Sequence, residues 1–231
     1  MRRRIYLMRH GAVVYFQPDG TPIDADNVPL SAEGCRQADH AGEALAGVRF
    51  DRVITSHLPR TRETAQRVMA LQPADHPQPA PEAVPELREL HGGDIEQIDD
   101  EDLYAAFTVA FRGVVPEHTA FLGGETIGAL MDRILPAFGR VLDDPDWDTL
   151  LMVLHGGVNR GLISRVLTGQ RMYLGSFEQA PGCINVLDMA ADSSRHSIVR
   201  CINTSAIDLA HTQTRETTME LLFGQYLQSR G

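Results

Sequence analysis

Two arginines and a histidine follow predicted strands in the first quarter of the chain. Arg9 and His10 come directly after the apolar run 5–8, and Arg60 comes shortly after the run 52–55, where a helix is expected to begin. In parallel sheets the carboxyl ends of the strands and the following helix N-termini are the usual ligand site. Guanidinium groups match the planar geometry of phosphate oxygens, and a neutral imidazole is a nucleophile. This pattern indicates chemistry on a phosphate group.

A second histidine and a carboxylate complete the set of candidate residues. His155 ends the apolar run 149–154, and Gly156 and Gly157 follow it, which lets the backbone approach a ligand closely. Glu89 lies on a short segment that we expect to be extended. A leaving alkoxide needs a proton, and a carboxylic acid can deliver it.

Each candidate also has a purely structural interpretation. An isolated arginine such as Arg9 or Arg60 is by default a surface ion-pair partner. His155 could be a satisfied core histidine, and Glu89 a solvated charge at the end of a strand. Taken alone, Glu89 favours the structural interpretation, and His155 fits the structural and the catalytic interpretation equally well. The catalytic interpretation becomes the better one when the segments that carry all these candidates are considered together, in their order along the chain.

A metal site is the main chemical alternative. The sequence contains no H-E-x-x-H, no closely spaced cysteine pair and no EF-hand loop, and two arginines beside the histidines would repel a divalent cation. We therefore expect no metal. His57 and His91 lie beside the motifs, but we expect neither to contact substrate, and we interpret Arg62 and Arg88 as structural.

These segments, in this order, resemble the histidine phosphatase superfamily, also called the phosphoglycerate mutase-like family. The resemblance runs from Arg9 to His155, extends over most of the chain, and includes residues 29–34 and 124–126. It implies phosphate chemistry without a metal or organic cofactor. The implied site comprises His10 as the phosphorylated nucleophile, Glu89 as the proton donor, and Arg9, Arg60, His155 and Gly156 around the phosphate.

The sequence departs from the mutase members of this family. Phe16 stands where mutases commonly have a phosphate-binding Asn, and Leu90 follows Glu89 where they have Arg. The chain also contains no lysine to meet a phosphoglycerate carboxylate. We therefore expect a phosphomonoester hydrolase acting on a small phosphorylated metabolite. A cofactor-dependent phosphoglycerate mutase is the alternative, and an inert family member that binds a phospho-ligand or a protein is the alternative of another class.

Composition limits the partners. The formal net charge is −10 and the sequence pI is about 5.3, which disfavours nucleic acid. The 21 cationic side chains are all Arg, which excludes lysine-based phosphate loops and Schiff bases. The three cysteines are far apart, and no apolar stretch is long enough for a leader or a membrane helix. We expect a cytoplasmic protein with no membrane partner, and the oligomeric state stays open, with a homodimer as one alternative.

The predicted strands alternate with helices, which is typical of an α/β fold. We expect one domain over residues 1–231, with three αβα layers, a mainly parallel central sheet and a helical cap at about 99–143. Strands are predicted at 4–9, 52–55, 149–154, 183–189 and 197–202. Helices are predicted at 31–46, from 59, at 100–112, at 125–143 with a kink or break at Pro136, at 158–167 and from 215.

Overall fold

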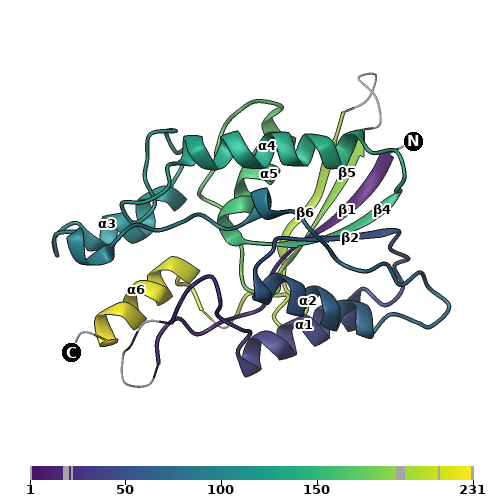
Figure 1. The fold of residues 1–231 in the computed structure, drawn as a ribbon, viewed down its shortest axis with the longest axis horizontal. Coiled ribbons are helices and arrows are strands. Elements are labelled where there is room, and N and C mark those ends of the chain that lie inside the picture. Colours follow the sequence, from purple (N-terminus) through teal and green to yellow (C-terminus); the bar gives the residue numbers. More distant parts are fainter. Residues whose placement is uncertain (1, 18–20, 22, 191–195, 213, 230–231) are drawn as a thin grey trace.

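The computed structural model describes residues 2–17, 21, 23–190, 196–212 and 214–229, and these form one six-stranded sheet with helices on both sides (Figure 1). The strand order is β3-β2-β4-β1-β5-β6. The strands are β1 (Arg2–Arg9), β2 (Arg52–Thr55), β3 (Glu82–Ala83), β4 (Thr149–Leu154), β5 (Ile184–Ala190) and β6 (Ile198–Thr204).

The sheet is mainly parallel, as predicted. β4 pairs in parallel with both β1 and β2, and β3 pairs in parallel with β2. β5 is antiparallel to both β1 and β6, so within the described part of the chain it alone runs against the other strands. The carboxyl ends of β1, β2 and β4 therefore meet at one edge.

Helices cover both faces of the sheet. Successive side chains of a strand point to opposite faces, and in the central strands both sets of side chains are apolar and buried. Leu7 and Met152 belong to the larger core cluster, under α4 (Ile127–Asp143) and α5 (Gly156–Thr168). The neighbouring Met8 and Val153 belong to the second cluster, under α1 (Ala32–Ala44) and α2 (Pro59–Ala70). Strands β1 and β4 are thus buried on both faces, which confirms the three-layer αβα arrangement.

Local signals set the starts of two helices. Ser31 is the N-cap of α1, where its side chain accepts a hydrogen bond from the Gly34 backbone, and Pro59 is the first residue of α2, as predicted. α1 ends slightly before the predicted residue 46: its last residue is Ala44 and its C-cap is Leu45.

Two further predictions need correction. Residues 85–87 (Pro85–Leu87) form a short 3-10 helix, η1, and the extended conformation begins only at Arg88. Helix α4 continues through Pro136 without a break, because Ile134, Ala137 and Phe138 remain packed in the core on either side of it.

Two helices lie away from the sheet, beside each other (Figure 1). They are α3 (Leu103–Thr108), which continues into the 3-10 helix η3 (Val109–Phe111), and α6 (Thr218–Ser229). Aromatic rings join them: the Phe107 ring centroid lies 5.4 Å from that of Phe223 and 5.7 Å from that of Tyr226. A further 3-10 helix, η2 (Ile95–Gln97), precedes α3. Among the described helices none is long and apolar enough to cross a membrane.

Candidate active site

His10 lies at the carboxyl end of β1 with only 2% of its surface exposed. Its Nδ1 is 2.7 Å from the carbonyl oxygen of Gly11. Because a carbonyl can only accept, Nδ1 carries the proton and Nε2 carries the lone pair. The Nε–H of Arg60 donates to that Nε2 at 3.3 Å. The reactive nitrogen of a neutral imidazole therefore faces a fixed cation.

The imidazole is kept neutral by its surroundings. Burial, and then the positive charges of Arg60 and Arg9, hold the pKa of His10 well below its usual value. A protonated imidazole has no free lone pair with which to attack phosphorus. The same two arginines that would bind phosphate thus also keep the nucleophile available.

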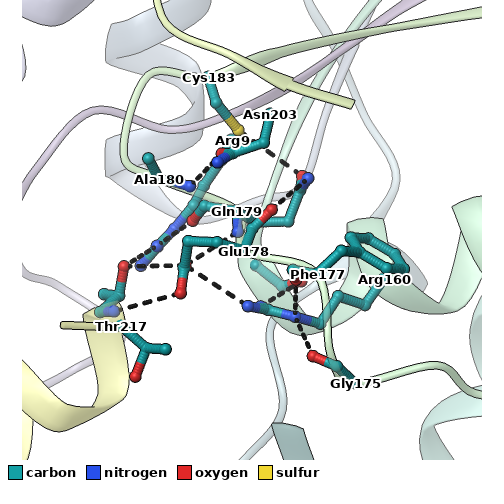
Figure 2. A network of polar contacts seen from close by, with 12 residues as sticks. Arg9, Arg160, Gly175, Phe177, Glu178, Gln179, Ala180, Cys183, Asn203 and Thr217 are labelled. Carbon is teal, nitrogen blue, oxygen red and sulfur yellow. Dashed lines mark hydrogen bonds and ion pairs between the residues drawn. The ribbon is translucent and has the colours of Figure 1, made fainter. Parts of the chain in front are cut away.

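Arg9 is anchored to a loop and to the start of the last helix. Its Nη1 donates to the carbonyl oxygen of Gln179 at 2.5 Å and to the Thr218 hydroxyl at 3.1 Å. Thr218 in turn donates to the Glu178 carboxylate at 3.1 Å. Figure 2 shows this group of contacts beside α6. The Nε of Arg9 is buried and lacks a hydrogen-bond partner among the described residues.

Glu178 connects Arg9 with a second buried arginine (Figure 2). Arg160, on α5, lies 3.4 Å from the Glu178 carboxylate and also donates to the carbonyl oxygen of Phe177 at 2.9 Å. Burial opposes ionisation of Glu178, but the charges of Arg160 and Arg9 outweigh it and hold the pKa of this carboxyl below its usual value. The ionised carboxylate offsets part of the positive charge behind the site.

His155 is completely buried at the end of β4, and its ring centroid lies 5.2 Å from that of His10. Its Nε2 is 2.8 Å from the Ser56 hydroxyl, whereas its Nδ1 has no partner among the described residues. Burial, followed by the charge of Arg60, lowers the pKa of His155 well below its usual value. A neutral ring has one N–H to donate, and one ring nitrogen is available for a ligand.

The Glu89 carboxylate is held at the N-terminus of α5. The Gly157 N–H lies 3.1 Å from both carboxylate oxygens, and the Leu90 N–H donates to Oε1 at 2.9 Å. The segment that carries Glu89 is fixed by Arg133 of α4, which donates to the carbonyl oxygens of Arg88 and Glu89 at 2.6 and 3.0 Å. Arg133 is itself paired with Glu125 at 2.7 Å.

These residues surround one cavity of about 1250 Å³. The cavity is cationic where Arg9 and Arg60 flank His10, and Glu89 and Gly156 contribute to its wall. The ring of His155 lies beside that of His10, and His155 is not among the residues that line the cavity. The aromatic side chains that line the cavity are Tyr15, Phe16, Phe107, Phe111, Phe121 and Tyr226. The acidic lining residues are Glu89, Asp24, Asp26, Asp94, Glu96, Asp99 and Asp100.

The structure brings together the six residues predicted from the sequence: Arg9, His10, Arg60, Glu89, His155 and Gly156. His57 is exposed and lies outside the cavity, and Arg62 is exposed as well. His91 and Arg88, in contrast, line the cavity. In the part of the chain that the structure describes, no group of three or more His, Cys, Asp or Glu side chains is arranged to hold a metal ion.

Sequence reasoning assigned no role to the residues that support this site. They are Ser56, Arg133, Arg160, Glu178 and Thr218. Ser56 follows the predicted strand 52–55 directly and Arg160 lies three residues after Gly157, so a signal for these two existed. Arg133, Glu178 and Thr218 lie outside the recognised segments, and their contacts join segments far apart in the sequence.

Comparisons with known proteins agree with this geometry. The adenosylcobalamin/alpha-ribazole phosphatase of Salmonella typhimurium is 33% identical over 193 residues, covering 80% of this chain and 90% of that protein. The crystal structure of the alpha-ribazole phosphatase from Shigella flexneri is 27% identical, with a TM-score of 0.64 over 87% of this chain and 96% of that one. A probable phosphoglycerate mutase, GpmB, of Salmonella paratyphi A is 29% identical over 166 residues, which is 71% of this chain and 74% of that protein.

The family model that matches the chain is the histidine phosphatase superfamily (branch 1), over residues 5–203. This span includes β2, β4 and β1 from Ile5 onward, with every residue of the predicted site. Together with relatives named as phosphatases along most of its length, the match shows that this chain is a phosphatase and belongs to branch 1 of the histidine phosphatase superfamily.

Proposed function

We propose that this chain hydrolyses small phosphomonoesters through a phosphohistidine formed on His10, without a metal ion. One observation carries the proposal. The Nε2 lone pair of a buried neutral imidazole lies on the cavity wall, 3.3 Å from the Nε of Arg60. The guanidinium that donates to this nitrogen also suits the oxygens of a phosphate group.

In the first step Nε2 of His10 attacks phosphorus, and the bond to the ester oxygen breaks. Glu89, protonated at this stage, gives its proton to the departing oxygen, which leaves as an alcohol. Arg9 and Arg60 bind the equatorial oxygens, where negative charge is spread in the transition state. We assign His155 the donation of one hydrogen bond to these oxygens, because its ring lies beside that of the nucleophile and its Nδ1 has no partner among the described residues.

In the second step water attacks the phosphohistidine. Glu89, now a carboxylate, accepts a proton from that water, and His10 leaves phosphorus as a neutral imidazole. Inorganic phosphate is released, and both residues return to their starting states. The pKa of His10, held low by burial and the arginines, makes the imidazole a good leaving group in this step.

We propose a substrate whose leaving alcohol carries an aromatic or otherwise flat apolar group, with α-ribazole phosphate as the first candidate. Phe16 and Tyr226 both line the cavity with ring centroids 6.3 Å apart, and the Phe107 ring lies 5.7 Å from that of Tyr226. Such rings favour stacking and apolar contact with a flat group. Relatives of this chain are named alpha-ribazole phosphatases, which supports the same substrate.

The two alternatives fit the site less well. A mutase must retain acidic phosphoglycerates and their bisphosphorylated cofactor, but here Phe16 supplies no hydrogen bond and carboxylates such as Asp24 and Asp94 line the cavity. An inert binding protein would not need both a proton donor at Glu89 and a neutral nucleophile at His10. Hydrolysis requires only these groups and water.

A panel of substrates tests the proposal. Purified protein is assayed with α-ribazole phosphate, glycerol 3-phosphate and 3-phosphoglycerate, with and without EDTA, and a coupled mutase assay with 2,3-bisphosphoglycerate runs in parallel. We expect phosphate release that survives EDTA, is blocked by vanadate and is fastest for α-ribazole phosphate. Activity that EDTA abolishes and a divalent ion restores would refute the metal-independent mechanism. Mutase turnover at about 10 s⁻¹ or more would establish the mutase instead.

A further inference from the structure

Ser56 connects β2 with the second histidine of the site. It is completely buried directly after β2, and its hydroxyl lies 2.8 Å from Nε2 of His155 and 3.0 Å from the Thr61 hydroxyl. It also accepts a hydrogen bond from the Leu58 backbone N–H at 3.3 Å. The Ser56 hydroxyl has one proton to give, and two neighbours that could take it.

The Thr61 hydroxyl also has a single proton, which it can give to Ser56 or to a carbonyl oxygen. The carbonyl oxygens of Leu58 and Ser56 lie 2.9 and 3.3 Å from it and only accept. Two arrangements therefore satisfy both the Ser56–Thr61 and the Ser56–His155 hydrogen bonds. Either Thr61 donates to Ser56 and Ser56 donates to His155, which then carries its proton on Nδ1, or His155 donates from Nε2 to Ser56, which donates to Thr61 while Thr61 donates to a carbonyl oxygen.

The two arrangements differ in what His155 offers to a ligand. The neutral ring has a single N–H, and its Nδ1 is buried without a partner, on a ring next to that of His10. Phosphoryl oxygens of an ester or of the transition state are acceptors, so they are bound by an Nδ1–H and repelled by an Nδ1 lone pair. Only the first arrangement gives His155 a function toward phosphate.

We propose that Ser56 is a positioning residue, whose hydroxyl donates to Nε2 of His155 and thereby holds the Nδ1–H of that ring toward the phosphoryl group. The inference rests on the proposed function, because it takes a phosphoryl group as the ligand. The hydroxyl selects the tautomer in the same way that a second hydrogen bond normally fixes a catalytic or metal-bound imidazole.

Nuclear magnetic resonance identifies the tautomer of the His155 ring in a measurement that does not depend on catalytic activity. Protein labelled with ¹⁵N-histidine is saturated with inorganic phosphate, and long-range ¹H–¹⁵N correlations show which ring nitrogen is protonated. The His155 signals are assigned with His155→Gln. We expect wild-type His155 to be protonated on Nδ1 and unprotonated on Nε2. Protonation on Nε2 in the phosphate-saturated wild type would overturn the proposal.

Two variants add a kinetic test. Ser56→Ala removes the donor, so we expect the Nε2–H form of His155 to appear and kcat/KM to fall about tenfold, the worth of one hydrogen bond of about 1.4 kcal/mol. Thr61→Val, the matched control, keeps the Ser56 donor and removes the acceptor that the second arrangement needs, so the Nδ1–H form and a kcat/KM within about twofold of wild type are expected. An unchanged tautomer and rate in Ser56→Ala, or equal losses in both variants, would contradict the proposal.

The outcomes separate this inference from the function on which it rests. A wild type that hydrolyses no ester refutes the proposed function, whatever the spectra show. An active wild type with an Nε2–H at His155 refutes only the role of Ser56. If Ser56→Ala does not fold, as judged by circular dichroism, the wild-type spectrum alone decides.

Discussion

Both carboxylate oxygens of Glu89 lie 3.1 Å from the backbone nitrogen of Gly157. Gly157 stands in the first turn of α5, directly after the strand end that carries His155. The candidate proton donor is therefore held by the same strand–helix junction that positions the second histidine. This arrangement places Glu89 on the wall of the cavity.

The effect of Glu89→Gln should depend on the leaving group. The amide keeps the shape of the side chain but cannot deliver a proton. An alkyl phosphate leaves as a basic alkoxide and needs that proton, so we expect kcat/KM to fall about 10²–10⁴-fold. A nitrophenyl phosphate leaves as a stabilised phenolate, and its loss should be at least about tenfold smaller. Equal losses on both esters would mean that Glu89 shapes the pocket without donating a proton.

Gly157→Ala should reproduce that pattern in weaker form. A Cβ at this position would lie 2.6 Å from Oε1 of Glu89 and 2.8 Å from Cδ1 of Leu90, so the carboxylate must move. We expect a loss of about tenfold or more on alkyl phosphates and a smaller loss on nitrophenyl phosphate. Gly139→Ala in α4 is the control, because a Cβ there meets nothing within 4 Å. Wild-type kinetics in Gly157→Ala would show that the position of Glu89 is not critical.

The buried histidines should make the fold less stable in mild acid. In the folded protein the pKa values of His10 and His155 lie well below 6.5, chiefly through burial, whereas the unfolded chain titrates near its ordinary value. As pH falls below that value, the unfolded state binds protons that the folded state does not, so stability is lost. Each histidine lowers the free energy of unfolding by up to about 1.4 kcal/mol for each pH unit of this decrease.

Urea unfolding at about pH 7 and about pH 5.5 measures how the free energy of unfolding changes with pH in wild type and in His10→Asn. The variant lacks one of the two buried imidazoles, so its stability should decrease less between the two pH values. Other titrating groups are common to both proteins and cancel in the comparison. An equal pH dependence of the free energy of unfolding in both proteins would contradict a neutral His10 in the folded protein.

The aromatic opening should determine substrate preference. Tyr226→Ala removes a ring that lies near Phe16 and Phe107, and we expect KM for α-ribazole phosphate to rise about tenfold, consistent with roughly 1–1.5 kcal/mol for an aromatic contact. KM for glycerol 3-phosphate should change little. Leu227→Ala is the control, since this neighbouring side chain is 47% exposed and does not line the cavity. Equal changes for both substrates would argue against stacking on this ring.

Local signals explain which parts of the structure could be predicted. The apolar run at β4 matches its strand residue for residue, and caps such as Ser31 and Pro59 act within one turn of the chain. The site residues were recognisable because each follows a strand or begins a helix, at the edge where parallel strands end. The η1 turn was missed because its Pro-Glu-Leu sequence carries no clear periodicity.

The contacts that support the site could not be predicted from the sequence, for a physical reason. Arg9 meets Thr218 across 209 residues, and Arg133 holds the carbonyl of Glu89 across 44. Such pairs depend on how layers pack, and in each pair one partner, Thr218 or Arg133, lies outside the segments recognised from the sequence. The placement of α6 over the cavity has the same origin, because its aromatic contacts are with α3 rather than with the sheet.

The most direct test of the account is a rapid-quench experiment with a ³²P-labelled phosphomonoester. We expect the denatured wild-type protein to carry label that is stable in base, labile in acid and located on His10 by peptide mapping. His10→Ala should carry no label and lose at least about 10⁴-fold in kcat. Label on another residue, or turnover by His10→Ala near the wild-type rate, would contradict a phosphohistidine mechanism at His10.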